Sequence, residues 1–230
     1  MKPFTYLLIN VGCLFIPFIA SFYPKRAFYK EWRPFFSANI LVAILFLVWD
    51  YFFTQFAFWG FNPEYLSGLY IANLPIEEVL FFICIPYACV FTYFIIKYLV
   101  TNNPILKLQK SISIFLILFL ILIGIWSFGK WYTALTAFLT AGYLIFMSIR
   151  KVDMGYIYLS YFIVLPFFFL SNGLLTGSFL DSPVVWYNDT ENLGIRIFTI
   201  PVEDMFYGFL LVVMNIDLYE YLRNNYFKKD

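Results

Sequence analysis

Apolar residues gather into seven long runs, separated by shorter segments that carry most of the polar and charged residues. The runs occupy residues 4–22, 35–57, 77–100, 111–128, 131–149, 155–177 and 203–222. A helix needs about 20 apolar residues to cross the hydrocarbon core of a bilayer, and each run is close to that length. The pattern therefore predicts an all-α fold, a polytopic membrane protein with seven transmembrane helices.

The composition strengthens this prediction. Hydrophobic residues make up 63% of the 230 residues and charged residues only 13%, about half of what soluble domains carry. The first run is followed by Lys25, Arg26, Lys30 and Arg33 rather than by a small-residue cleavage site, so we interpret it as a span and not a signal peptide. The net charge of +1 argues against a nucleic-acid partner and leaves membrane lipid as the expected surroundings.

Basic residues are distributed unequally between the two ends of these spans. The end with loops 23–34, 101–110 and 150–154 and the C-terminal tail holds twelve of them: Lys25, Arg26, Lys30, Arg33, Lys97, Lys107, Lys110, Arg150, Lys151, Arg223, Lys228 and Lys229. The other end holds three: Lys2, Lys130 and Arg196. Because basic residues concentrate on the cytoplasmic side, we expect a bacterial-type inner (plasma) membrane protein with its N-terminus outside and its C-terminus cytoplasmic.

The chain repeats itself at a distance of 126 residues. The stretch FNPEYLSGLYIANLPIEE at 61–78 aligns without a gap with YNDTENLGIRIFTIPVED at 187–204. The identical positions include Asn62 with Asn188, Gly68 with Gly194, Ile71 with Ile197, Pro75 with Pro201, and Glu77 with Glu203. Upstream, Asp50 and Thr54 correspond to Asn172 and Thr176 after a four-residue shift.

This register predicts two parallel three-helix repeats, at residues 1–105 and 130–230, joined by a spacer transmembrane helix at 106–129. Three helices repeated directly would place the second copy upside down. An unpaired fourth helix restores the orientation, as a repeat about an axis along the membrane normal requires. Both acid motifs should therefore lie at the same, non-cytoplasmic end.

Two interpretations fit the acids Glu77, Glu78, Glu203 and Asp204. A proline followed by acids is a good helix start, because acids in the first turn complement the helix dipole. The pattern recurs at matching places, however, and ionisable groups at membrane helix ends are typical of functional sites. The chain has no histidine, so proton chemistry would have to use carboxyl groups. Asp50 and Asn172 could bond helices together or line a site.

The aromatic content adds to the second interpretation. There are 31 Phe, 19 Tyr and 6 Trp, and although interfacial belts and packing account for most of them, aromatic faces also stabilise cations. Such surroundings suit an acid-initiated reaction through a carbocation. No metal-binding cluster is evident in the sequence.

The motifs LPIEE and IPVED, each heading a third helix, together with VVWYNDTENLGIRIFTIPVEDMFYG, resemble the lycopene cyclase domain family. The likeness covers nearly the whole chain, as a fusion of the two subunit types. It implies an intramolecular lyase (isomerase) that converts the linear ends of lycopene into β-ionone rings, through γ-carotene to β-carotene. It implies catalytic roles for Glu77, Glu78, Glu203 and Asp204, of which we expect the identical pair Glu77 and Glu203 to be essential.

We further expect Asp50, Asn172, Asn62 and Asn188 to contact a carotenoid substrate taken from the bilayer. No cofactor is expected, because the reaction is redox-neutral and the sequence has no dinucleotide-binding glycine fingerprint. The alternative is a non-enzymatic, proton-coupled membrane transporter, which intramembrane acids and repeats also suit. A homo-oligomer, or association with other carotenoid enzymes, stays open, as does the choice between one composite site and two.

Overall fold

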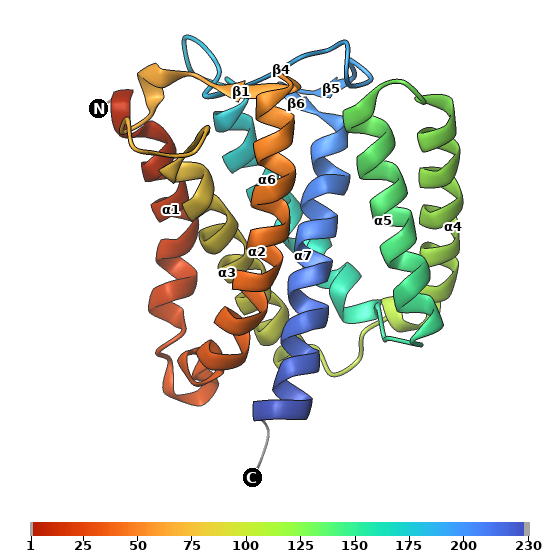
Figure 1. The fold of residues 1–230 in the computed structure, drawn as a ribbon. Coiled ribbons are helices and arrows are strands. Elements are labelled where there is room, and N and C mark those ends of the chain that lie inside the picture. Colours follow the sequence, from red (N-terminus) through yellow and green to blue (C-terminus); the bar gives the residue numbers. More distant parts are fainter. Residues whose placement is uncertain (1, 228–230) are drawn as a thin grey trace.

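Seven membrane-length helices form the body of the protein (Figure 1). A computed structural model describes residues 2–227, so Lys228 and Lys229, counted among the basic residues above, lie outside the described residues. The helices are α1 (Thr5–Ala20), α2 (Trp32–Gln55), α3 (Ile76–Leu99), α4 (Ile105–Trp126), α5 (Trp131–Ile149), α6 (Gly155–Leu175) and α7 (Val202–Leu222). Each is long and apolar enough to cross a membrane, which confirms the predicted all-α, seven-span class.

Helix α4 begins six residues before its predicted start. At its start, the backbone N–H of Ile105 donates to the side-chain oxygen of Asn103, 3.0 Å away. Lys107 and Lys110 then fall in the first two turns. Long basic side chains can extend along a helix toward the membrane surface, so the apolar run understates the length of this helix. The other six begin within three residues of the prediction.

Helix α7 lies at the centre of the bundle and packs against α2, α3 and α5. Helix α1 packs on α3 and α4 packs on α5, at opposite sides of the bundle (Figure 1). Few side chains of α1 and α4 are buried, whereas about half of those of α7 are. The outer helices therefore present apolar side chains outward, as contact with lipid requires, and the inner ones form the core.

Short segments complete the described chain. Four are 3-10 helices, at Lys2–Phe4, Pro24–Arg26, Phe28–Glu31 and Pro63–Tyr65, and a π-helical turn at Arg223–Phe227 extends α7. Three antiparallel strand pairs, which the apolar pattern did not predict, lie at the end of the bundle that holds the N-terminus (Figure 1). They are β1 (Trp59–Phe61) with β4 (Val185–Tyr187), β2 (Tyr70–Ile71) with β3 (Leu74–Pro75), and β5 (Arg196–Ile197) with β6 (Ile200–Pro201).

The β1–β4 pair joins the two long loops of the chain. Gly60 lies opposite Trp186 in this pair, and an added Cβ at Gly60 would lie 2.4 Å from the indole ring of Trp186. Only glycine leaves room for that ring. The two loops are thereby held against each other above the bundle.

The other two pairs are equivalent hairpins, and each leads directly into a helix. Pro75 ends β3 immediately before α3, and Pro201 ends β6 immediately before α7. The prolines are thus the last extended residues and not, as the helix-start interpretation supposed, the first helical ones. Because the hairpins share one end of the bundle, both acid motifs start their helices at that same end (Figure 1).

Candidate active site

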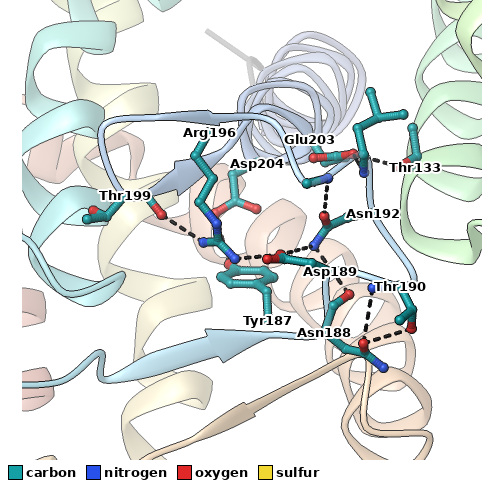
Figure 2. Close-up of polar contacts among 12 residues, drawn as sticks. Thr133, Tyr187, Asn188, Asp189, Thr190, Asn192, Arg196, Thr199, Glu203 and Asp204 are labelled. Atoms are coloured by element: carbon teal, nitrogen blue, oxygen red, sulfur yellow. Dashed lines mark hydrogen bonds and ion pairs between the residues drawn. The ribbon is translucent and has the colours of Figure 1, made fainter.

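The first acid of each motif holds the loop that precedes it. Oε1 of Glu77 accepts the backbone N–H of Ser67 at 2.7 Å, and Oε1 of Glu203 accepts that of Leu193 at 2.8 Å. Thr133 also donates to Oε1 of Glu203, at 2.6 Å (Figure 2). Both glutamates are buried, and their Oε2 atoms lack a hydrogen-bond partner among residues 2–227. Glu77 and Glu203 therefore fix equivalent loops against the starts of α3 and α7.

The second acid of each motif points toward the interior of the bundle. Consecutive helical residues diverge by about 100°, so the neighbours of Glu77 and Glu203 meet different partners. Tyr6 donates to Oε2 of Glu78 at 2.5 Å, and Tyr132 donates to Oδ1 of Asp204 at 2.5 Å. Tyr6 and Tyr132 are themselves separated by the repeat distance. The two halves thus present the same tyrosine–carboxyl contact.

Beside this shared contact, the halves differ in one residue. The carboxyl of Asp50, on α2, lies beside the Glu78 carboxyl. At the equivalent place on α6, Asn172 donates its amide N–H to Oδ2 of Asp204 at 2.7 Å. An amide can always donate to a carboxylate, whereas two carboxyls form a hydrogen bond only when one carries a proton. The first half therefore places a second carboxyl beside its acid, where the second half places an amide.

A further tyrosine hydroxyl bonds each of the two carboxyl groups. Tyr207 donates to Oδ1 of Asp50 at 2.6 Å, and Tyr187 donates to Oδ2 of Asp204 at 2.9 Å. Asp204 consequently accepts hydrogen bonds from three side chains. Tyr187 stands on β4, outside the spans. Burial of this phenol, and to a lesser extent the nearby carboxyl of Asp204, raises its pKa well above the usual value near 10. It therefore remains a proton donor at neutral pH.

Aromatic rings fill the space between the two carboxyl groups. The Trp59 ring lies 5.0 Å from Tyr132, 6.2 Å from Tyr187 and 6.0 Å from Tyr207, measured between ring centroids. Tyr132 and Tyr187 are stacked at 6.0 Å. Since Tyr207 bonds Asp50 while Tyr132 and Tyr187 bond Asp204, the two acid groups belong to a single cluster. We call Asp50, Glu78, Asp204, Asn172 and these four aromatic residues, together with Tyr6, the carboxyl cluster.

The loop of the second half closes over this cluster (Figure 2). Arg196 donates to the backbone oxygen of Thr199 at 2.9 Å and pairs with Asp189 at 2.6 Å. Its guanidinium lies 5.9 Å from the centroid of the Tyr187 ring. These contacts hold Tyr187 in the position from which it reaches Asp204, and they cover one side of the cluster with protein.

The structure brings some predicted site residues together and leaves two apart. Asp50, Asn172 and all four motif acids lie at the cluster or immediately beside it. Asn62 instead accepts the N–H of Glu64 at 3.1 Å, and Asn188 accepts the N–H of Thr190, also at 3.1 Å. These two asparagines cap turns of their own loops, at the same place in each half. Substrate contact by Asn62 or Asn188 stays a prediction, with no cluster contact to support it.

Four tyrosines of the cluster were missed in the sequence. The repeat distance between Tyr6 and Tyr132 is a signal that could have identified them. Tyr187 and Tyr207 correspond to Phe61 and Phe81 of the first half. Phenylalanine has no hydroxyl group, so the repeat does not identify these two tyrosines. Within residues 2–227, no group of three or more His, Cys, Asp or Glu side chains is arranged to hold a metal ion.

These features define a polytopic membrane protein with a buried carboxyl site built from two similar halves. A family model described as lycopene cyclase matches the chain twice, at residues 3–96 and 129–222. The chain therefore belongs to the lycopene cyclase family, as a fused form that contains two repeats, and its role lies in carotenoid cyclisation with a carotenoid as substrate. No curated protein and no solved structure was found to match it.

Proposed function

We propose that the protein is a lycopene β-cyclase, which closes the linear ends of lycopene to β-ionone rings through γ-carotene to β-carotene. The observation that carries this proposal is the pair of neighbouring buried carboxyls Asp50 and Glu78, which Tyr207 and Tyr6 bond and which can share a proton. Asp204, with its three hydrogen-bond donors, lies in the same cluster. An acid and a carboxylate in one shielded site are the groups that an acid–base isomerisation needs.

The first step is protonation of the terminal double bond by the Asp50–Glu78 pair. The resulting tertiary cation is attacked by an internal double bond of the same substrate, which forms the carbon–carbon bond of the ring. Asp204 then removes a proton from the ring cation, and the new ring double bond forms. One proton enters and one leaves, so the product is an isomer of the substrate and no electrons are exchanged.

The enzyme is restored when the proton returns from Asp204 to the acid pair. We assign this transfer to the tyrosine hydroxyls of the cluster, because Tyr132 and Tyr187 bond Asp204 while Tyr207 bonds Asp50. The aromatic faces, with Trp59 at their centre, stabilise the cation without adding to it. Exclusion of water protects the cation from hydration.

The two repeats, at 1–105 and 130–230 with the spacer at 106–129, would then supply different parts of one site. The first gives the acid pair and the second gives the base. Glu77 and Glu203 act as positioning residues, because their contacts hold the loops. A single composite site forms one ring at a time, so the substrate leaves and returns with its other end for the second ring.

The test uses purified protein in detergent with lycopene in buffered heavy water, without added nucleotide or flavin. Because the carboxyl and tyrosine protons exchange with solvent whenever the substrate has left, we expect rings to form, each with one deuterium at the carbon protonated in the first step. Rings free of deuterium would rule out initiation by a solvent-exchangeable acid, and an absolute need for NADPH or FAD would reveal a different reaction. A transporter would leave the red colour of lycopene-producing cells unchanged, whereas a cyclase turns them orange-yellow.

A further inference from the structure

An apolar groove lies on the outer face of the bundle between α2 and α5, with α7 as its floor. Its volume is about 270 Å³. The walls include Leu45 and Trp49 of α2 and Gly142 and Tyr143 of α5, and the floor is made by Leu210 and Met214 of α7. Leu45 is 53% exposed, so the groove opens toward the side of the protein that faces lipid. Charged side chains are absent from the residues that line it.

Trp49 connects the groove to the carboxyl cluster. Trp49 lines the groove, and its ring lies 5.1 Å from that of Tyr207. Tyr207 in turn donates to Asp50 at 2.6 Å. An occupant of the groove that contacts Trp49 is therefore separated from Asp50 by two side chains, those of Trp49 and Tyr207.

The equivalent place in the other half is lined by different side chains. Leu139 and Trp49 line the groove. In the other half, Cys13 of α1 corresponds to Leu139 by the repeat distance, and Ser171 of α6 corresponds to Trp49 by the shifted register. Ser171 donates to the backbone oxygen of Phe167, within its own helix, at 2.9 Å. Ile16 also stands where the groove has Gly142. The two halves thus differ at these positions as well as in their acids.

We propose that the α2–α5 groove binds one polyene arm of the carotenoid substrate and is its lateral route from the bilayer to the carboxyl cluster. This inference rests on the proposed function. An uncharged lining suits a hydrocarbon and offers no partner to a phospholipid headgroup. The α5 part of the lining runs from Phe138 to Phe146, about 12 Å along a helix, which matches part of a long polyene and not its whole length.

Gly142 provides a direct test. A Cβ added there meets no atom within 4 Å, and the same holds for Gly12 on α1. Both glycines are exposed within helices, so larger side chains at either position improve helix propensity and displace no neighbour. The series Ala, Val, Leu and Trp at position 142 extends into the groove. The same series at position 12 extends into lipid elsewhere and serves as the matched control.

The experiment compares initial rates of ring formation at equal amounts of membrane-inserted protein. We expect the rate to fall with side-chain size at position 142, at least tenfold for Gly142→Trp, while Gly12→Trp stays within twofold of wild type. A folded Gly142→Trp with a normal rate would overturn the inference. Should that variant fail to accumulate, a normal rate for Gly142→Leu would have the same meaning.

Carotenoid binding separates this inference from the proposed function. Purified wild type, Gly142→Trp and Gly12→Trp are incubated with lycopene in detergent, and the pigment retained on the protein is measured by absorbance. We expect retention to fall at least tenfold for Gly142→Trp alone. If wild type forms no rings but shows this binding pattern, the proposed reaction is wrong and carotenoid binding in the groove is supported. Equal retention by all three proteins would refute carotenoid binding in the groove.

Discussion

Tyr207 of the second repeat donates its phenolic hydrogen to Asp50 of the first, across a distance of 2.6 Å. The bond connects α7 to α2 at the place where Asp50 also meets Glu78. Neither half of the chain therefore has a complete acid site by itself. The acid pair depends on a tyrosine that the other half supplies, and this dependence leads to distinct expectations for single substitutions.

Asp50→Asn should abolish most ring formation. The asparagine retains an oxygen that can accept from Tyr207, so the fold is maintained, but the group that shares a proton with Glu78 is gone. General acid catalysis contributes about 10²- to 10⁴-fold, and we expect a loss in that range at a normal membrane level. The control is Asp153→Asn, which changes an exposed acid bonded to Gln109 and should leave the rate within twofold. A fully active Asp50→Asn protein would remove the acid pair from the mechanism.

Glu78→Gln and Asp204→Asn, made separately, should each leave mostly lycopene. In a composite site every ring needs both the acid pair and the base, so neither variant completes even the first ring efficiently. The measurement is chromatographic separation of lycopene, one-ring γ-carotene and two-ring β-carotene. Accumulation of γ-carotene at a near-normal first-ring rate would mean that each half carries its own site.

Glutamine and alanine should have different effects at Glu77. Gln keeps a carbonyl oxygen that can accept from Ser67, whereas Ala leaves that N–H unpaired, which costs about 1–3 kcal/mol when the group is buried. We expect Glu77→Ala to lower both thermal stability and cyclisation, and Glu77→Gln to retain most of each. We expect alanine and glutamine to differ in the same way at Glu203. Glutamine variants that are stable and inactive would instead support the essential acid role predicted from the sequence.

The orientation in the membrane can be tested with reporter fusions. Asp189 lies in the loop at the end of the acid motifs, and Lys107 lies at the opposite end of the bundle. We expect a periplasm-active reporter to work after Asp189 and a cytoplasm-active one after Lys107, because basic residues concentrate on the Lys107 side. Activity of both fusions on one side would contradict the proposed orientation.

The sequence by itself determined the number of helices and nearly all of their ends. Crossing a bilayer requires a continuous apolar run, and such a run is visible without knowledge of its neighbours. The repeat of LPIEE and IPVED likewise indicated that both acid pairs start their helices at one end, because an odd number of spans between the copies preserves direction. Asp50 and Asn172 stood out as polar residues within apolar runs.

Only the tertiary structure decided how these residues divide the chemistry. The apolar pattern does not specify how far each helix turns about its axis, and that rotation determines which carboxyl meets Ser67 in the loop and which meets Tyr6 in the interior. The strand pair between Trp59 and Tyr187 joins segments that are remote in sequence, so it follows from the packing of the two halves. The same packing places Tyr207 beside Asp50. The first repeat has Phe81 at the matching position, which carries no hydroxyl group, so the repeat could not predict this hydrogen bond.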